Sequence, residues 1–342
     1  MDISNIYNYL NVSKLNHNLS ENDFNEILDK LTENIYNYGF DKLLEDYNSK
    51  LKDIHKDWLS LKNYKIDKNY ISSTNTTGLS IIKKYMTHIY EVENFKGTSI
   101  KKLWTLDNIK KVLIINRKTH STPYVSEIIR QLGFMAGTSK VTIYRPILTK
   151  RIVEYFNATN VLDICVGWGG RMLGSSCINN VNYTGIEPYS KTYNNLVNIK
   201  NQLNLNNVIL YNNTAENVLP ILKQKNIKYD LALTSPPYYN LEIYTNEINQ
   251  SHHYQTYQEW IDKFLKPSVY GVLELLTDNG TSCWSVKNFK TDKNYHLYND
   301  IVKLHLDKNW ILIDTQFYVG NPIRPGSKDT SKEITYIFKN NN

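Results

Sequence analysis

Apolar residues in the first part of the chain recur at the three- and four-residue intervals of an amphipathic helix. They follow Ser20-Glu21-Asn22-Asp23, which offers a hydroxyl and a carboxylate to the first amides of a helix, and they are Phe24, Ile27, Leu28 and Leu31. The stretch 36–44 continues this face or starts a second helix. We therefore predict a helical region over residues 1–95, with a linker at the turn-rich segment 72–78.

After residue 145 the pattern changes to short apolar runs that alternate with amphipathic segments. Two helices within 107–135, broken around 119–123, and a helix through 148–156 come first. Strands are then predicted near 160–166, 182–187, 207–211, 229–234 and 280–286, and helices near 170–178, 190–203, 215–225 and 257–276. Such alternation is typical of an α/β fold whose parallel sheet is covered on both faces. Two last strands, 310–319 and 333–338, have no helix between them and should form an antiparallel hairpin at the sheet edge.

Composition narrows the class of protein without naming a function. The 342 residues and 40.0 kDa suffice for one large core and a smaller domain. No apolar run approaches the ~18 residues of a membrane span, and the start at Met1 lacks a secretory pattern, so an intracellular setting is expected. Three cysteines without paired spacing are expected to be reduced packing residues. The net charge of +7 is compatible with a polyanionic partner, although an AT-rich coding bias inflates lysine and tyrosine.

A glycine-rich turn follows the first predicted strand. Asp163 ends the strand, and Gly167, Gly169 and Gly170 open the next helix. Glycines allow positive φ and a close approach of the backbone to a ligand. A second acid, Glu187, ends the next strand 24 positions later (187 minus 163), where a carboxylate can accept both hydroxyls of a ribose.

This spacing favours a ligand that contains adenosine. NAD is the rival of S-adenosylmethionine, but Met172 stands where a dinucleotide fingerprint needs a third glycine or alanine. S-adenosylmethionine has no pyrophosphate, so its loop need not present that pattern. A purely structural strand-to-helix turn is the alternative interpretation of the glycines.

The segment Thr234-Ser235-Pro236-Pro237-Tyr238 follows the fourth predicted strand and has the residue types needed to methylate an amine conjugated to a ring. Such an amine becomes nucleophilic when its two hydrogens are accepted, here by the Ser235 hydroxyl and the Pro236 carbonyl. The prolines fix φ and hold the acceptors in place. Tyr238 is expected to stack on a flipped base. An ordinary Pro-Pro turn is the alternative.

In this order, the glycine loop, Glu187 and the Ser-Pro-Pro-Tyr turn resemble the S-adenosylmethionine-dependent amino methyltransferases of DNA, which modify adenine N6 or cytosine N4. The resemblance covers about residues 140–338 and implies a Rossmann-like class I methyltransferase sheet within a domain over 96–342. The Gly-Trp-Gly-Gly-Arg form of the loop, around Trp168, departs from the commoner pattern and is similar to that of phage-like members.

The resemblance also implies a set of cofactor contacts. It places loop residues at the cofactor, the segment after the third strand beside the adenine, and Tyr144 with Arg145 over the methionine end. The implied cofactor-binding residues are Asp163, Cys165, Gly167, Gly169, Glu187, Asn213, Thr214 and Tyr144. A plain packing role for Tyr144 is equally open.

Two related reactions fit less well. Methylation of cytosine at carbon 5 needs a cysteine nucleophile, usually after proline, and none of the three cysteines follows a proline. Glutamine methylation uses a similar turn with Asn where this chain has Ser235. Ser before Pro-Pro-Tyr favours cytosine N4, but adenine N6 remains open.

Two groups of residues are candidates for contact with a nucleic-acid target. Polar and aromatic groups fill 239–260, which either contacts a flipped base or is a mobile polar loop; its His252-His253 pair lacks partners at metal spacing, so no metal is expected. Basic residues either meet phosphates or are solvated, and they are Arg324, Lys328, Lys332, Lys83-Lys84, Lys101-Lys102 and Lys110-Lys111.

The sequence leaves three functions open: a DNA amino methyltransferase, an RNA base methyltransferase, and a non-catalytic nucleic-acid-binding partner subunit. An intact Ser-Pro-Pro-Tyr argues against the partner subunit, because such a subunit has no need of the acceptors. A lone modification enzyme, half of a restriction system and a viral genome modifier acting in a host cell all fit.

Overall fold

The computed structural model describes residues 20–66, 75–119, 125–137, 141–319 and 333–341. The chain forms two compact units, each built from two stretches of sequence: 1–51 with 87–141, and 52–86 with 142–342. We call them the helical unit and the sheet unit. The predicted division was contiguous, at residue 95, whereas here residues 52–86 belong with the sheet and 96–141 with the helices. The linker predicted at 72–78 lies partly outside the described residues.

The helical unit begins as its apolar pattern predicts. The Ser20 hydroxyl accepts a hydrogen bond from the Asp23 amide at 3.1 Å, and the Asp23 carboxylate accepts one from the Ser20 amide at 3.3 Å, so a reciprocal cap starts the first described helix. Its elements are α3 (Glu21–Tyr38), α4 (Phe40–Ser49), a 3₁₀ turn (Thr87–Glu91), β1 (Glu93–Asn94), a 3₁₀ turn (Lys101–Leu103), α7 (Leu106–Lys118) and α8 (Val125–Ala136). Leu31, Ile109 and Leu132 lie in its core and are fully buried.

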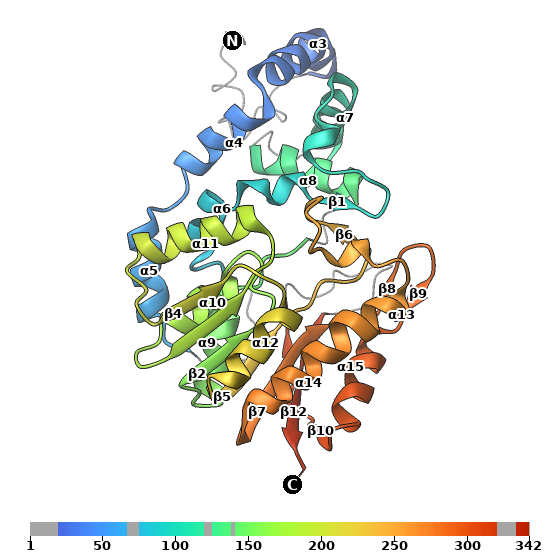
Figure 1. The fold of residues 1–342 in the computed structure, drawn as a ribbon. Helices are drawn as coiled ribbons and strands as arrows, with labels where there is room; N and C mark the ends of the chain where they lie inside the picture. The colour runs from blue at the N-terminus through green and yellow to red at the C-terminus, as the bar shows by residue number, and fades with distance from the viewer. Residues whose placement is uncertain (1–19, 67–74, 120–124, 138–140, 320–332, 342) are drawn as a thin grey trace. The chain divides into compact units, whose positions relative to one another are not determined.

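The sheet unit contains the predicted mixed sheet (Figure 1). Its strands are β2 (Asn160–Asp163), β3 (Asn182–Ile186), β4 (Val208–Tyr211), β5 (Tyr229–Thr234), β7 (Leu276–Val286), β10 (Trp310–Leu312), β11 (Phe317–Tyr318) and β12 (Ile334–Asn340). The order is β10-β12-β7-β5-β2-β3-β4, with β11 beside β12. Strands β2, β3, β4, β5 and β7 are parallel, and β12 is antiparallel to β7 and to β10. The predicted fold class and the antiparallel C-terminal pairing are therefore confirmed.

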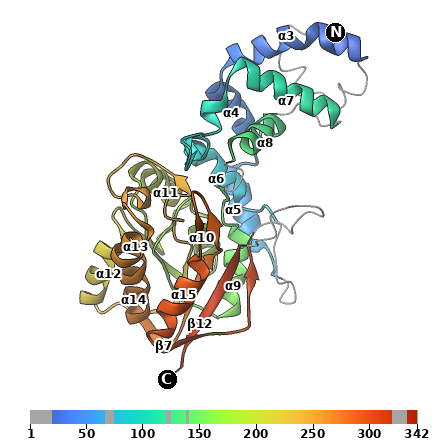
Figure 2. The same cartoon turned by 90° about the vertical axis from the view of Figure 1, so that its right-hand side faces the viewer.

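Helices cover both faces of this sheet (Figures 1 and 2). On one face lie α12 (Ala215–Gln224), α14 (Lys266–Leu275) and α15 (Leu297–Leu306), and on the other lie α9 (Pro146–Tyr155) and α10 (Gly170–Ser176). Helix α11 (Ser190–Gln202) connects β3 to β4. The helix predicted at 257–276 is divided into α13 (Tyr257–Trp260), a π-helical turn (Ile261–Leu265) and α14. The remaining short elements are β6 (Glu242–Ile243), a 3₁₀ turn (Ser251–His253), β8 (Phe289–Lys290) and β9 (Asn294–Tyr295).

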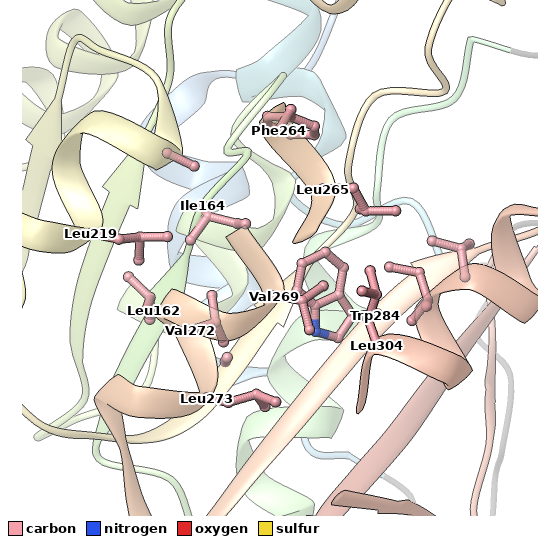
Figure 3. Packing of buried hydrophobic residues seen from close by; sticks show 14 of the residues in the cluster. Leu162, Ile164, Leu219, Phe264, Leu265, Val269, Val272, Leu273, Trp284 and Leu304 are labelled. Carbon is pink, nitrogen blue, oxygen red and sulfur yellow. The ribbon is translucent and has the colours of Figure 1, made fainter. Parts of the chain in front are cut away.

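The core between the sheet and the first of these helix layers is closely packed (Figure 3). Leu162 from β2, Val272 from α14 and Trp284 from β7 are fully buried in it. Burying a side chain of this size contributes about 1.5–3 kcal/mol relative to leaving it exposed. The apolar runs of the central parallel strands β2 and β5 are almost entirely buried, which explains why they were recognisable in the sequence.

Residues 52–86 contain α5 (Ile54–Asn63) and α6 (Leu79–Tyr85). A buried lysine in α9 binds the end of α5. The Lys150 ammonium in α9 donates to three carbonyls at the end of α5, those of Leu61, Lys62 and Tyr64, at 2.8 to 3.1 Å. A lysine at a helix C-terminus satisfies carbonyls that have no partner within the helix. A Cβ on Gly78 would lie 2.9 Å from Pro146, so this segment also packs closely on the start of α9.

Candidate active site

The strand order reverses between β2 and β5. The chain runs from β2 outward to β3 and β4, then returns to place β5 on the other side of β2. Open α/β sheets bind ligands beyond the carboxyl ends of their strands at such a reversal. The glycine loop follows β2 and the Ser-Pro-Pro-Tyr turn follows β5, so both predicted motifs leave the sheet at this point.

The glycine loop needs its glycines for two different reasons. Gly167 and Gly169 have φ of 56° and 87°, which side chains rarely adopt, and Gly169 precedes the first residue of α10. A Cβ on Gly170 would lie 1.7 Å from the Tyr144 carbonyl oxygen. A Cβ on Gly167 would meet only the Cys165 carbonyl oxygen, at 3.9 Å, so the loop is open at Gly167 and closely packed at Gly170.

Asp163 supports this loop from inside the protein. It is fully buried, and its carboxylate accepts hydrogen bonds from Arg171 Nε and from the Tyr183 hydroxyl, both at 2.7 Å, and from the Cys165 amide at 3.2 Å. The Arg171 guanidinium also donates to the Cys165 carbonyl. Both carboxylate oxygens are thus occupied by the protein. The predicted contact of Asp163 with the cofactor stays a prediction, and the structure adds Arg171 and Tyr183 as its partners.

Glu187 links the end of β3 to the glycine loop. Its carboxylate accepts the amide of Gly167 at 2.8 Å and that of Tyr189 at 2.9 Å. Only 7% of the residue is exposed, and this burial raises the pKa of Glu187 to about 7. Near neutral pH this acid therefore changes its charge beside the loop.

The residues after β4 lie next to Glu187. The Asn212 side chain donates to the Glu187 carbonyl at 2.9 Å, and the Glu187 amide donates to the Tyr211 carbonyl at 3.0 Å. Asn213 is exposed, and its side chain accepts the Thr214 amide at 2.8 Å at the start of α12. Asn212 was missed in the sequence because it is one of many asparagines.

Cys165 and Tyr144 complete the predicted cofactor set. Cys165 is half-buried, and burial raises the pKa of its thiol. Tyr144 is buried, its ring lies under the Arg171 guanidinium with 5.2 Å between the guanidinium carbon and the ring centroid, and its hydroxyl is 2.8 Å from that of Thr335. The Thr335 hydroxyl is in turn 2.7 Å from that of Ser285. Tyr144 packs between the loop and the C-terminal strands with its hydroxyl occupied.

The Ser-Pro-Pro-Tyr turn leaves β5 beside β7. The Ser235 hydroxyl donates to the Ser285 carbonyl of β7 at 3.1 Å. A hydroxyl has one proton and two lone pairs, so this bond directs its proton toward β7 and leaves acceptor capacity. Pro236 is buried and Pro237 half-buried, and the chain leaves the turn through Tyr239, at φ 46°.

Tyr238 is packed on one side. Its ring stacks on Phe289 with centroids 5.5 Å apart and planes 10° apart, and 9% of the residue is exposed. Phe289 in turn stacks on Tyr295 at 4.9 Å. Stacking of Tyr238 on a base would therefore have to use the face turned away from Phe289. Phe289 supports a predicted site residue and was not singled out in the sequence.

A carboxylate that the sequence did not reveal also reaches the turn. Glu333 comes just before β12, and its Oε1 lies 3.5 Å from the Ser235 hydroxyl. The register pairs Thr335 with Ser285 and Ile334 with Val286, so β12 begins where β7 ends. The first residues of an antiparallel strand lie at the edge where its parallel neighbours end. Only this pairing brings residue 333 to residue 235.

The segment 239–260 folds against its neighbours in the sheet unit. The Tyr239 hydroxyl donates to the Tyr254 carbonyl at 3.2 Å, and the Ser251 hydroxyl donates to the Tyr239 carbonyl at 2.7 Å. Tyr244 contacts Trp168 of the glycine loop, with 5.9 Å between ring centroids. Within the described ranges no three His, Cys, Asp or Glu side chains are grouped to hold a metal ion.

The predicted basic contacts fall into two groups. Arg324, Lys328 and Lys332 lie outside the described residues. Lys101, Lys102 and Lys110 form ion pairs within the helical unit, with Glu91, Glu93 and Asp29 among their partners, and Lys83 and Lys84 lie in the last turn of α6. Exposed pairs of this kind contribute about 0–1 kcal/mol, as expected for a solvated surface. In the part of the chain that the structure describes, no helix is long and apolar enough to cross a membrane.

Comparison with known proteins identifies no family. No family model and no curated protein matches the sequence. Among solved structures, TrmN from Thermus thermophilus is similar with a TM-score of 0.39 and 14% identity over 57% of this chain and 48% of its own. A SAM-dependent methyltransferase from Agrobacterium tumefaciens has a TM-score of 0.39 and 11% identity over 57% of this chain and 60% of its own.

A third solved structure is shorter than the others. A putative rRNA methylase from Clostridium thermocellum has a TM-score of 0.38 and 13% identity over 58% of this chain and 97% of its own. This chain thus spans about half of the first structure and three fifths of the second. Similarity at this level says nothing about substrate, so function has to be inferred from the site residues.

Proposed function

We propose that the sheet unit transfers a methyl group from S-adenosylmethionine to an exocyclic amine of a DNA base, cytosine N4 or adenine N6. The reversal of strand order between β2 and β5 carries this proposal, because both predicted motifs meet there. A purely structural Pro-Pro turn would have no need to lie beside a glycine loop at this position.

The residues of the loop are compatible with the cofactor. The backbone is open at Gly167, where a ligand can approach, and a buried carboxylate lies beside it on Glu187. When ionised, Glu187 would accept the two ribose hydroxyls, while Asn213 and Thr214 would lie beside the adenine. Bound S-adenosylmethionine supplies an activated methyl group on a sulfonium, and no covalent enzyme intermediate is needed.

The turn after β5 would bind the amine. The Ser235 hydroxyl directs its own proton to the Ser285 carbonyl, so its lone pairs can accept one amine hydrogen. The Pro236 carbonyl would accept the other, and Tyr238 would stack on the base with the face turned away from Phe289. Accepting both hydrogens localises the nitrogen lone pair for attack on the methyl group.

Mass spectrometry of nucleosides tests this function directly. The purified protein would be incubated with S-adenosylmethionine carrying a labelled methyl group and with unmodified DNA or RNA, and the nucleic acid then digested. We expect label in N4-methylcytosine or N6-methyladenine from DNA. Ser235→Ala should lose transfer but keep cofactor affinity in calorimetry, whereas Ser126→Ala, an exposed serine of the helical unit, should keep both.

Other results would redirect or refute the proposal. Label in RNA alone would assign an RNA base methyltransferase, and label at cytosine carbon 5 would exclude the role given to Ser235. Transfer to neither nucleic acid would favour a non-catalytic partner subunit. Failure to bind S-adenosylmethionine would remove the cofactor assignment.

A further inference from the structure

Glu333 has no role in the function proposed above, yet it is held next to the proposed amine acceptor. Its carbonyl accepts the Val319 amide at 3.0 Å, and the pairing of Thr335 with Ser285 fixes the strand that follows. Its carboxylate is then 3.5 Å from the Ser235 hydroxyl. The backbone bond at Glu333 and the strand pairing at Thr335 thus position a proton acceptor next to Ser235.

The Ser235 hydroxyl has one proton and two acceptors within reach. The Ser285 carbonyl lies at 3.1 Å and the Glu333 carboxylate at 3.5 Å, so rotation about the Cβ–Oγ bond directs the proton to one or the other. Catalytic hydrogen bonds in ligand-free structures are often long and tighten in the reacting complex. Only the carboxylate of this pair can keep a proton, since a backbone carbonyl is not basic enough.

Methylation of an amine requires that a proton be removed. The nitrogen lone pair forms the new bond to the methyl carbon while the carbon–sulfur bond breaks, and the sulfur departs as a neutral thioether. The nitrogen then carries a methyl group, two hydrogens and a positive charge, and losing one proton restores a neutral methylamine. That proton starts on a hydrogen already bonded to Ser235 in the proposed function.

We propose that Glu333 takes up this proton through Ser235: the amine proton passes to the Ser235 oxygen as the hydroxyl proton passes to the Glu333 carboxylate. The inference rests on the proposed methyl transfer and extends it with a positioning residue that acts through Ser235. Each hydroxyl and carboxylate returns to its starting state when Glu333 releases the proton to solvent.

The surroundings of Glu333 suit this role. Burial raises its pKa to about 7, with Lys287 and Arg171 lowering it and Glu242 raising it. Such an acid both accepts and releases a proton near neutral pH. Burial and then the charge of this carboxylate raise the pKa of Tyr238 in the turn after β5. The neighbouring acids are engaged elsewhere: Glu242 accepts the Tyr244 hydroxyl, and Glu187 accepts two amides.

The test is the pH dependence of methyl transfer in a single turnover at saturating S-adenosylmethionine. Saturation removes the effect of Glu187, which would change the KM for the cofactor instead. For the wild type we expect a rate that rises with pH through about 7. Glu333→Gln should lower the rate by about 10²-fold, remove that rise and leave cofactor affinity unchanged.

Glu242→Gln is the matched control, because Glu242 is another half-buried acid whose pKa is raised by burial, and its carboxylate accepts the Tyr244 hydroxyl rather than that of Ser235. The control should keep the rise in rate, displaced to lower pH because Glu242 no longer raises the pKa of Glu333. If Glu333→Gln does not fold, Glu333→Asp keeps the charge, withdraws it from Ser235 by one methylene and should show an intermediate loss. An unchanged rate and pH profile in Glu333→Gln would overturn the relay.

A second readout needs no activity. Carbon-13 NMR of labelled glutamate carboxyls should show the Glu333 resonance titrating near pH 7, and Ser235→Ala should raise that pKa, because the ionised carboxylate loses a hydrogen-bond donor. A Glu333 titration indifferent to Ser235 would refute the contact. Absence of methyl transfer by the wild type would refute the proposed function itself. That result differs from a Glu333→Gln variant whose rate and pH profile match those of an active wild type, which would refute the relay alone.

Discussion

The glycine loop after β2 and the proline turn after β5 lie at the same edge of one sheet but are held by different forces. The loop depends on buried charges: Asp163 pairs with Arg171, and Glu187 accepts an amide of the loop itself. The turn depends on two prolines, on a bond from Ser235 to β7 and on the stacking of Tyr238 on Phe289. Binding on the proposed cofactor side should therefore respond to charge and pH, and binding on the proposed base side to shape, with the proton transfer to Glu333 as the step there that depends on pH.

The largest effect is expected from breaking the buried ion pair. Arg171→Met leaves the fully buried Asp163 carboxylate without its cation, which costs about 3–5 kcal/mol. Urea unfolding measures this loss, and Asp163→Asn combined with Arg171→Met should recover much of it. As a control, Lys263→Met removes an exposed pair with Glu259 and should cost less than about 1 kcal/mol. Equal losses in the two single variants would mean that charge does not hold the loop.

A steric change in the same loop should have the next largest effect. Gly170→Ala places a Cβ against the Tyr144 carbonyl oxygen, and because both are backbone groups neither can move away alone. We expect a loss of about 1–3 kcal/mol in unfolding free energy together with weaker cofactor binding. Calorimetry and urea unfolding on one preparation separate the two effects. A fully stable variant would show that the loop can shift away from Tyr144.

Cofactor binding should depend on pH through Glu187. The ionised carboxylate is the form that accepts two ribose hydroxyls, and its pKa is about 7, so affinity should rise about tenfold, or about 1.4 kcal/mol, from pH 6 to pH 8. Glu187→Gln should bind more weakly at pH 8 and show no such rise. Binding to the wild type that is independent of pH would contradict the assignment of Glu187.

Stability should change with pH in the opposite direction. The pKa of Glu187 in the folded state, about 7, lies above its unfolded value near 4.5, so its contribution favours the folded state at low pH. That contribution is fully present below pH 4.5 and is lost as the pH rises through 7. Unfolding free energies of the wild type and Glu187→Gln should therefore diverge by about 1–3 kcal/mol between pH 5 and pH 8. A constant difference would show that Glu187 does not titrate in this range.

The smallest effect is expected on the base side. Phe289→Leu keeps most of the buried area and removes the stacking on Tyr238, worth about 0.5–1.5 kcal/mol. We expect a KM for nucleic acid raised a few-fold, with cofactor affinity unchanged and no new pH dependence. A change in cofactor affinity instead would show that the two sides are not held independently.

The sequence predicted those parts of the molecule that depend on neighbouring residues. Strands β2 to β5 were recognisable as apolar runs, and the cap of α3 as Ser20 with Asp23. The partners of the site residues were not recognisable. Glu333 is 98 residues from Ser235 and reaches it only through the register of β12 on β7, while the occupation of Asp163 by Arg171 depends on side-chain geometry within the loop.

The domain boundary shows the same limit. Residues 52–86 have the polar helical composition of the chain that precedes them, so the sequence placed them in the N-terminal region. Their contacts within the sheet unit run through the Lys150 side chain, which binds backbone carbonyls, and through the packing of Gly78 on Pro146. A carbonyl carries no sequence signal, because every residue has one.

The contacts of Lys150 also determine where the chain can be truncated without loss of buried hydrogen bonds. A fragment cut at the predicted boundary, residue 96, would retain the Lys150 ammonium but lose the Leu61, Lys62 and Tyr64 carbonyls that it binds. The Lys150 ammonium, which is buried in the whole chain, would then face water or empty space beside α9 instead of its three acceptors. A minimal version of the sheet unit should instead keep residues 52–86 and connect residue 86 to residue 142 by a short flexible linker. The helical unit can then be supplied as a separate polypeptide.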